Sequence, residues 1–485
     1  MKSQLKRILA GIFAGLMLLP AVSCSTANDP SGETKDPDAT DTVTEDDTGY
    51  KPDIAKKDYD SEFVMMGTGS VYHCAAASED SAGDPFSDSI YERSIRVQEY
   101  LGVELIRLPE MGGTSYAEAV IRTVQSGDDE YQLVTAPRHV GINSLIISGG
   151  MFDFAALDSV DLDAPYWSRS LMEEYLVGEA YLIGYNDFCL ANSSCLVFNK
   201  DLMAKYNLKE PYDDVHNMNW TMDTMISLVS DVSEDSNGDG VLNESDVYGL
   251  TGDGWGDYLS LNMACGIKVA ARDSDGVYHV AYNDNPERMQ AYLQKVDELL
   301  KAEFAYFGRY GTGTTGYEAS FGSGHALICM KLTDELMAMR DSQIRFGILP
   351  FPMFDKHQGE YYSLNWNGML MIPGTIQNTD MVGDVLEMLA YYTAPVKTAF
   401  YEDLLGSKLS EAPEDAAMLD IIWNSQSSDV SLVVADLNAQ VWVELLYLVP
   451  TLATEGVDQY ASFMRQREKA ANKIIDRLFN PKNRR

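Results

Sequence analysis

Short apolar strands alternate with amphipathic helices along the chain from Glu62, and this order limits the folds open to it. Apolar residues on one face, with Gly102 and Gly127 as stops, indicate helices between the strands. The order strand, helix, strand, helix, strand predicts an α/β fold with a parallel sheet and helices on its faces. The predicted elements are a strand at 62–67, a helix at 88–100 with Ser87 as N-cap, a strand at 103–106, a helix at 116–126 and a strand at 131–134.

A second α/β body is predicted to begin near Cys189. Its strand is Leu196–Asn199, and Thr221 has the residue type that caps a helix N-terminus. No repeat of 20–50 residues is visible, which argues against a solenoid or a propeller. The predicted helices of this body span 201–206, 222–232, 286–300, 440–447 and 470–479.

The N-terminal sequence is typical of an export signal. Residues 1–7 are basic and an apolar run from Ile8 to Val22 follows, which is too short to span a bilayer core. Small residues then lead into Cys24 and resemble a bacterial lipobox, with Ala21 where Leu is usual. The resemblance implies that residues 1–23 are a signal peptide and that Cys24 carries two acyl chains, enough for stable anchoring. Ordinary cleavage with an incidental Cys24 is the alternative.

Residues 24–60 form a predicted acidic tether. They are rich in Asp, Thr, Pro, Gly and Ser and have too few apolar residues to offset chain entropy. The whole chain of 485 residues carries 74 Asp and Glu against 36 Lys and Arg, a net charge of −38. Phosphate backbones and anionic membrane surfaces attract basic proteins, so no nucleic-acid partner is expected.

The cysteines give no sign of a disulfide framework. Five remain after Cys24, an odd number on an exported chain, and none has a CxxC partner. We expect buried thiols, with a Cys189–Cys195 pair as the open alternative.

Six stretches, taken in order, resemble motifs of extracellular solute-binding proteins of bacterial sugar ABC importers (family 1, the maltodextrin-binding type). Gln132 stands where the family usually has Asp. The resemblance spans residues 62–480. The stretches are 127–134 (GDDEYQLV), 196–202 (LVFNKDL), 219–223 (NWTMD), 246–250 (DVYGL), 321–327 (FGSGHAL) and 346–352 (FGILPFP).

The resemblance implies a two-lobed periplasmic-binding-protein-like fold with a hinged interlobe cleft. Lobe one would hold 61–186 with 331–392, and lobe two 187–330 with 393–485. The chain would cross between the lobes near 183–190, 328–333 and 390–396.

A sugar site needs aromatic plates for C–H faces and planar donors or acceptors for hydroxyls. Trp255 is the first candidate, because glycines flank it and Asp253 and Asp257 lie close in sequence, followed by Tyr258. The alternative is that Trp255 and Tyr258 fill a seam between helix and sheet.

Further ligand-binding candidates lie near predicted strand ends or on a late helix. Trp442 has helical spacing that also suits a core residue, and a salt bridge is the alternative role of Arg138. Tyr166 and Trp167 are expected to pack a loop under lobe one. The further candidates are Thr68, Ser70, Arg138, Asn365, Trp366 and Trp442.

Residues 235–246 follow the EF-hand pattern D-x-[DN]-x-[DN]-G. Oxygens at alternate positions converge because the chain turns at Gly240, and Asp246 stands where Glu is usual. The pattern predicts one structural Ca²⁺ of modest affinity, and a plain Asn-Gly-Asp-Gly turn is the alternative. The expected ligands are Asp235, Asn237, Asp239, the Val241 carbonyl and Asp246. No catalytic zinc site or catalytic cofactor is expected, since the six His lack metal-ligand spacing.

Together these features predict a monomeric, lipid-anchored receptor on the extracellular side of the cell membrane. It would capture an oligosaccharide between its lobes and deliver it to ABC permease subunits without catalysis. One alternative is a surface glycoside hydrolase that uses Asp253 and Asp257, because both glycosidase mechanisms need two carboxylates. Another is the same fold with a peptide or an acidic sugar as ligand.

Overall fold

A computed structural model describes most of the chain from residue 49. The described residues are 49–67, 85–109, 111, 114–136, 141–190, 192–243, 245–252, 256–307, 320–339, 343–366, 368–405, 413–435 and 440–480. They all belong to one compact unit, residues 46–485. The signal peptide and residues 24–48 of the predicted tether, Cys24 included, lie outside them, whereas residues 49–60 of that tether are described. No helix within these ranges is both long and apolar enough to cross a membrane.

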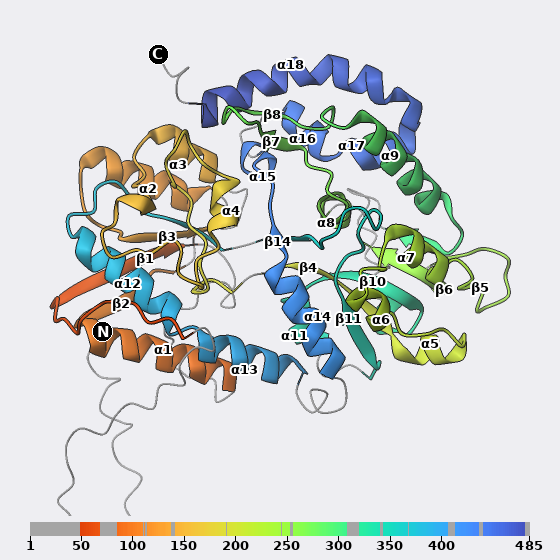
Figure 1. The fold of residues 1–485 in the computed structure, drawn as a ribbon, viewed down its shortest axis with the longest axis horizontal. Helices are drawn as coiled ribbons and strands as arrows, with labels where there is room; N and C mark the ends of the chain where they lie inside the picture. The colour runs from red at the N-terminus through yellow and green to blue at the C-terminus, as the bar shows by residue number, and fades with distance from the viewer. Residues whose placement is uncertain are drawn as a thin grey trace, which may run out of the picture. The chain divides into compact units, whose positions relative to one another are not determined.

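Four strands form the first sheet: β1 (Ser61–Gly67), β2 (Val103–Arg107), β3 (Leu133–Ala136) and β13 (Met369–Met371). Their order is β13-β3-β1-β2, and Figure 1 shows β3, β1 and β2 side by side. β1 pairs in parallel with both β2 and β3, which confirms the predicted parallel arrangement, and β13 adds an antiparallel edge.

The helices of this first body are α1 (Pro85–Leu101), α2 (Ser115–Ser126), α3 (Ile142–Ser148), α4 (Arg169–Glu173), α12 (Thr379–Tyr391) and α13 (Ala394–Leu405), with a short 3₁₀ turn η1 (Phe154–Ala156). α1 packs on β2, α12 and α13. Every residue of α12 from Met381 to Tyr391 is buried. A helix buried on all sides must satisfy its polar side chains internally, and α12 carries two such carboxylates, Asp384 and Glu387.

Six strands form the second sheet: β4 (Ser194–Asn199), β5 (Ser233–Glu234), β6 (Val247–Gly252), β9 (Ala305–Phe307), β10 (Ala326–Leu332) and β11 (Phe346–Leu349). Five follow the order β11-β4-β10-β6-β5, and β9 pairs with β6. The sheet is mixed, since β10 runs parallel to β6 and antiparallel to β4. Helices of this second body are α5 (Lys200–Lys205), α6 (Tyr212–His216), α7 (Met222–Val229), α8 (Gly256–Ala264), α9 (Pro286–Lys301), α11 (Glu335–Met339) and α14 (Pro413–Asn424).

The C-terminal helices pack around a small hairpin. The hairpin is β7 (Ala270–Arg272) with β8 (Tyr278–Val280), and β8 contacts α18. The C-terminal elements are α15 (Ser431–Val434), α16 (Gln440–Leu446), α17 (Leu448–Glu455), η3 (Val457–Gln459) and α18 (Tyr460–Phe479). α15 and α18 also contact α3, so this group touches both bodies.

Local signals predicted several boundaries. Gly127 ends α2 with a φ of 81°, and the Thr221 hydroxyl accepts a hydrogen bond from the backbone N–H of Thr224 to cap α7. The predicted N-cap at Ser87 is wrong, because α1 already starts at Pro85, a residue favoured in a first turn. α18 starts at Tyr460, about ten residues before the predicted start near residue 470.

One of the three expected crossings between the bodies, that near 328–333, lies elsewhere in the structure. β11 pairs with β4 of the second sheet, although the predicted boundaries assign 331–392 to lobe one. The return to the first sheet comes at β13, after Trp366, and not near 328–333. Two short strands mark the crossing, β12 (Ser363–Leu364) and β14 (Gln426–Ser427), which pair in parallel.

The prediction for the cysteines is wrong for Cys189. Cys189 is in a disulfide, and its partner lies outside the described residues. Cys195, the partner considered from sequence, is a free buried thiol in β4, as are Cys265 and Cys329 elsewhere. Burial raises the pKa of the Cys329 thiol to about 12, so these thiols are unreactive while the protein is folded.

Replacing Cys189 by Ser should therefore lower the free energy of unfolding by about 2–4 kcal/mol, because the disulfide restricts the unfolded chain. Urea unfolding of the wild type and of Cys189→Ser, each with and without dithiothreitol, measures this. The reductant should destabilise the wild type and leave the variant unchanged. Equal losses in both proteins would show that the disulfide of Cys189 contributes nothing.

Candidate functional site

The described parts of both sheets stop just before several predicted ligand residues. β1 ends at Gly67, β3 at Ala136 and β6 at Gly252. The chain directly after each end lies outside the described residues, and it holds five candidates: Thr68, Ser70, Arg138, Asp253 and Trp255. Their ligand roles remain predictions.

Asp257 and Tyr258 lie on the first turn of α8, beside the carboxyl end of β6. A Cβ added at Gly252 would come within 2.6 Å of an Asp257 carboxylate oxygen, so this helix start sits against the strand end. Tyr258 is buried, and its ring stacks on Phe307 at a centroid distance of 5.9 Å. The position of Tyr258 matches the alternative role, a filler between helix and sheet.

Trp366 and Asn365 lie at the crossing between the bodies. The Trp366 indole is 2% exposed, and its N–H donates to the Ser194 hydroxyl at 2.7 Å. The Asn365 amide donates to the Gln426 side-chain oxygen at 2.7 Å. The side chains of Asn365 and Trp366 thus hydrogen-bond to other residues at the crossing. The buried indole of Trp366 leaves no ring face on which a sugar could stack.

The remaining tryptophan candidate is a core residue. Trp442 has no exposed surface, and its indole N–H donates to the Ala471 carbonyl of α18 at 3.2 Å. Tyr166 and Trp167 pack in the first body as expected, and both donate to the buried Glu387 carboxylate.

Two adjoining cavities flank β14. Cavity one encloses about 580 Å³ and cavity two about 410 Å³, both within the size range of small-molecule sites. Their walls come from the segment 162–174 of the first body and from α14 and β14. Residues 360–362 complete cavity one. Four residues line both cavities: Ser170, Leu171, Asn424 and Gln426.

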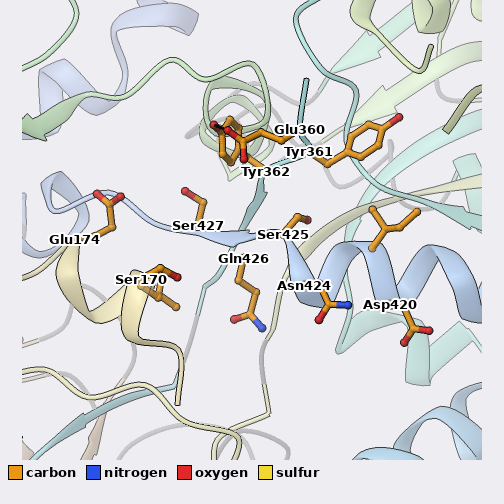
Figure 2. Close-up of a pocket in the computed structure, with 12 residues that line it drawn as sticks. Ser170, Glu174, Glu360, Tyr361, Tyr362, Asp420, Asn424, Ser425, Gln426 and Ser427 are labelled. Carbon is orange, nitrogen blue, oxygen red and sulfur yellow. Dashed lines mark hydrogen bonds between the residues drawn. The ribbon is translucent and has the colours of Figure 1, made fainter. Parts of the chain in front are cut away.

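The side chains of β14 alternate across the strand. Figure 2 shows Ser425 and Ser427 on one side and the Gln426 amide on the other. This alternation follows from the extended backbone, in which neighbouring side chains point to opposite faces. Hydroxyls and amides are groups that hydrogen-bond to alcohols, and the Gln426 amide is held in place because its oxygen accepts from Asn365 and its nitrogen donates to the Trp423 carbonyl.

Cavity two contains a half-buried aromatic plate, Trp423, at the end of α14. The Lys397 ammonium lies 4.3 Å from the Trp423 ring centroid, and Tyr401 meets the ring edge-on. Asn424 and Gln426 are its polar neighbours in the wall. An indole beside side-chain amides has the composition of a sugar subsite.

Cavity one is acidic and carries Tyr362, whose hydroxyl donates to Glu360 (Figure 2). Burial, aided by that hydrogen bond, raises the pKa of Tyr362 to about 12. Burial also raises the pKa of Glu174, although the Lys268 ammonium paired with it opposes the rise. The Tyr362 phenol therefore stays neutral at physiological pH.

Sequence reasoning missed the residues that line these cavities. α14 was not predicted, and so Trp423 had no assigned place. The polar run directly after Trp423, residues 424–427, was the available signal, since a helix that ends on a Trp beside such residues can present it to solvent.

The predicted calcium loop forms a compact turn. The Asp235 carboxylate accepts backbone N–H groups from Gly238 and Gly240, each at 2.7 Å, and this lowers the pKa of Asp235. Asp246 is buried and accepts from Ser236 and Asn243. Across the described ranges, no group of three or more His, Cys, Asp or Glu is gathered into a metal-ligand set.

No protein-family model matches the chain, and no curated protein matches it either. Solved structures do. An ABC substrate-binding protein from Listeria monocytogenes in complex with cycloalternan matches with a TM-score of 0.52 at 10% identity, covering 87% of this chain and 99% of that one. An ABC transporter solute-binding protein from Agrobacterium radiobacter K84 in complex with ribitol also gives 0.52, at 15% identity, covering 86% and 99%. The chain has their fold. It is an α/β protein of the two-lobed, periplasmic-binding-protein-like class.

Proposed function

We propose that the protein is the substrate-binding component of an ABC importer and that its ligand is a carbohydrate. The observation that carries the proposal is the pair of cavities with walls from both bodies, in a fold shared with two binding proteins solved with a cyclic saccharide and a polyol. The described walls offer an indole, a phenol, hydroxyls and amides. Such groups bind sugars without reacting with them.

We propose further that the ligand is an oligosaccharide. The two cavities adjoin across Gln426 and each has its own aromatic ring, Tyr362 in one and Trp423 in the other. Sugar units on both sides of β14 would use both rings, whereas a single unit would use one.

The test is a binding measurement with cycloalternan, linear maltotetraose and ribitol as probes. A ligand at 100 times its Kd should add about 2.7 kcal/mol to the free energy of unfolding. Trp423→Ala should weaken oligosaccharide binding about tenfold, because the aromatic face is lost, while Trp423→Phe keeps a ring and most of the affinity.

Three results would count against these proposals. Equal affinity of Trp423→Ala and wild type would show that Trp423 does not bind the ligand. Tighter binding of ribitol than of either saccharide would contradict the proposal that the ligand is an oligosaccharide. Release of smaller sugars from maltotetraose by the purified protein would favour the glycosidase alternative.

We propose that Cys24 anchors the protein to the outer side of the cell membrane through acyl chains, within reach of permease subunits. The support is the lipobox-like sequence and the acidic tether after it. Cys24→Ser should abolish incorporation of labelled palmitate and move the protein from the detergent phase to the aqueous phase, whereas Ser23→Ala should change neither.

The cysteine count offers a second check on the anchor. Acylation at Cys24 uses its sulfur in a thioether, so the proposal requires that Cys189 pairs with Cys74. Peptide mapping under non-reducing conditions that finds Cys24 in a disulfide would contradict the anchor.

We also propose that residues 235–246 bind one Ca²⁺. The motif supports this, and the carboxylates of the half-buried Asp235 and the exposed Asp239 accept only backbone N–H groups and keep free lone pairs. Millimolar Ca²⁺ should raise the melting temperature of the wild type and of Asp231→Ala, an exposed acid outside the loop. It should not raise that of Asp239→Ala. An equal rise in all three proteins, or none in the wild type, would dismiss the site.

A further inference from the structure

Much of the wall of cavity two is built by a loop, residues 161–168, that leads into α4. Residues 162–171 supply most of that wall from the first body, including Trp167. A loop needs fixed contacts to keep a binding wall in place. Those contacts converge on one buried carboxylate beneath it.

Glu387 lies on α12 with no exposed surface, and it accepts three hydrogen bonds from this loop. The Trp167 indole N–H donates to Oε1 at 2.6 Å, and the backbone N–H of Asp161 donates to the same oxygen at 3.0 Å. The Tyr166 hydroxyl donates to Oε2. No ion pair of Glu387 is found in the described part of the chain, so these donors alone stabilise its charge.

We propose that Glu387 is a positioning residue for the wall of cavity two, and that proton uptake at Glu387 changes how firmly the wall is held. The inference rests on the proposed function, because it assigns the wall to a ligand site. Glu387 itself does not line either cavity.

Burial makes the charge of Glu387 sensitive to pH near neutrality. It raises the pKa of Glu387 to about 7, against the three donors that lower it. The titratable groups around Glu387 are Tyr166 and Asp161 on the loop, Tyr50 on the N-terminal segment, whose hydroxyl donates to Asp161 at 2.7 Å, and Asp384 and Tyr391 on α12. Asp384 is already paired with Lys57 at 2.6 Å.

Protonation changes the direction of the hydrogen bonds around Glu387, but Glu387 stays hydrogen-bonded to the loop. The neutral acid has one oxygen fewer to accept with, so Oε2 donates to the Tyr166 hydroxyl, which turns its own proton toward Tyr50, its hydrogen-bonding neighbour. The folded pKa lies above the unfolded value near 4.5. The contribution of Glu387 to stability is therefore fully present below pH 4.5 and is lost as pH rises through 7.

The experiment compares wild type, Glu387→Gln and the matched control Asp384→Asn, a buried carboxylate one turn earlier that does not contact the loop. Between pH 5 and 8 the folding constant of the wild type should fall about a hundredfold more than that of Glu387→Gln, and Asp384→Asn should keep the wild-type slope. Hydrogen exchange of residues 161–171 should rise in Glu387→Gln alone.

A second variant covers the case in which Glu387→Gln fails to fold. Tyr166→Phe removes one donor to the charged form, so the transition attributed to Glu387 should move to higher pH. Identical pH slopes in wild type and Glu387→Gln, or an unmoved transition in Tyr166→Phe, would overturn the proposal.

Binding separates this inference from the proposed function. Glu387→Gln should weaken cycloalternan binding about tenfold while Asp384→Asn does not. Wild-type affinity in Glu387→Gln, together with faster exchange in the loop, would make the contact purely structural and overturn the positioning role. Failure of the wild type to bind any saccharide counts against the proposed function, and the exchange data then decide whether Glu387 holds the wall.

Discussion

The pairing of β12 with β14 is the contact on which the placement of the two bodies depends. Ser363 and Leu364 pair with Gln426 and Ser427, and the Asn365 N–H extends the ladder to the Ser427 carbonyl at 2.9 Å. The segment in which the chain first crosses between the bodies contacts this ladder too. There, the backbone N–H of Trp366 donates to the Asn192 carbonyl at 2.8 Å. Buried backbone groups must find partners, so passages that share one ladder hold one another in register.

The shape of both cavities depends on the pairing of β12 with β14, because residues of β14 line both of them. Gln426 of β14 lines both cavities, while the Ser425 and Ser427 hydroxyls line cavity one. α14 leads into β14 and is fixed at its far end, where Asp415 accepts from the Tyr212 hydroxyl at 2.6 Å and from the Ile348 N–H at 2.8 Å. The position of Trp423 thus follows from two anchors on the second body, one at each end of a single helix.

Local sequence signals predicted the three parallel strands of the first sheet and some helix ends, because Gly127 and Thr221 act on their own neighbours. They could not predict that β11 joins the second sheet, since that pairing joins residues nearly 150 positions apart. The tryptophans show the same limit for the site. Trp366 and Trp442 are buried and Trp423 faces a cavity, and only the packing of distant segments separates these outcomes. The disulfide of Cys189 escaped prediction for this reason too.

That disulfide has a consequence for how the chain must mature. Disulfides form in oxidising compartments, so the bond at Cys189 closes only where the surroundings are oxidising. Cys195 follows six positions later and, while unfolded, would compete as a partner by thiol exchange. Insertion of β4 between β10 and β11 removes that competitor, since Cys195 is then fully buried. Correct oxidation therefore favours an order of events in which the centre of the second sheet assembles before the bond at Cys189 closes.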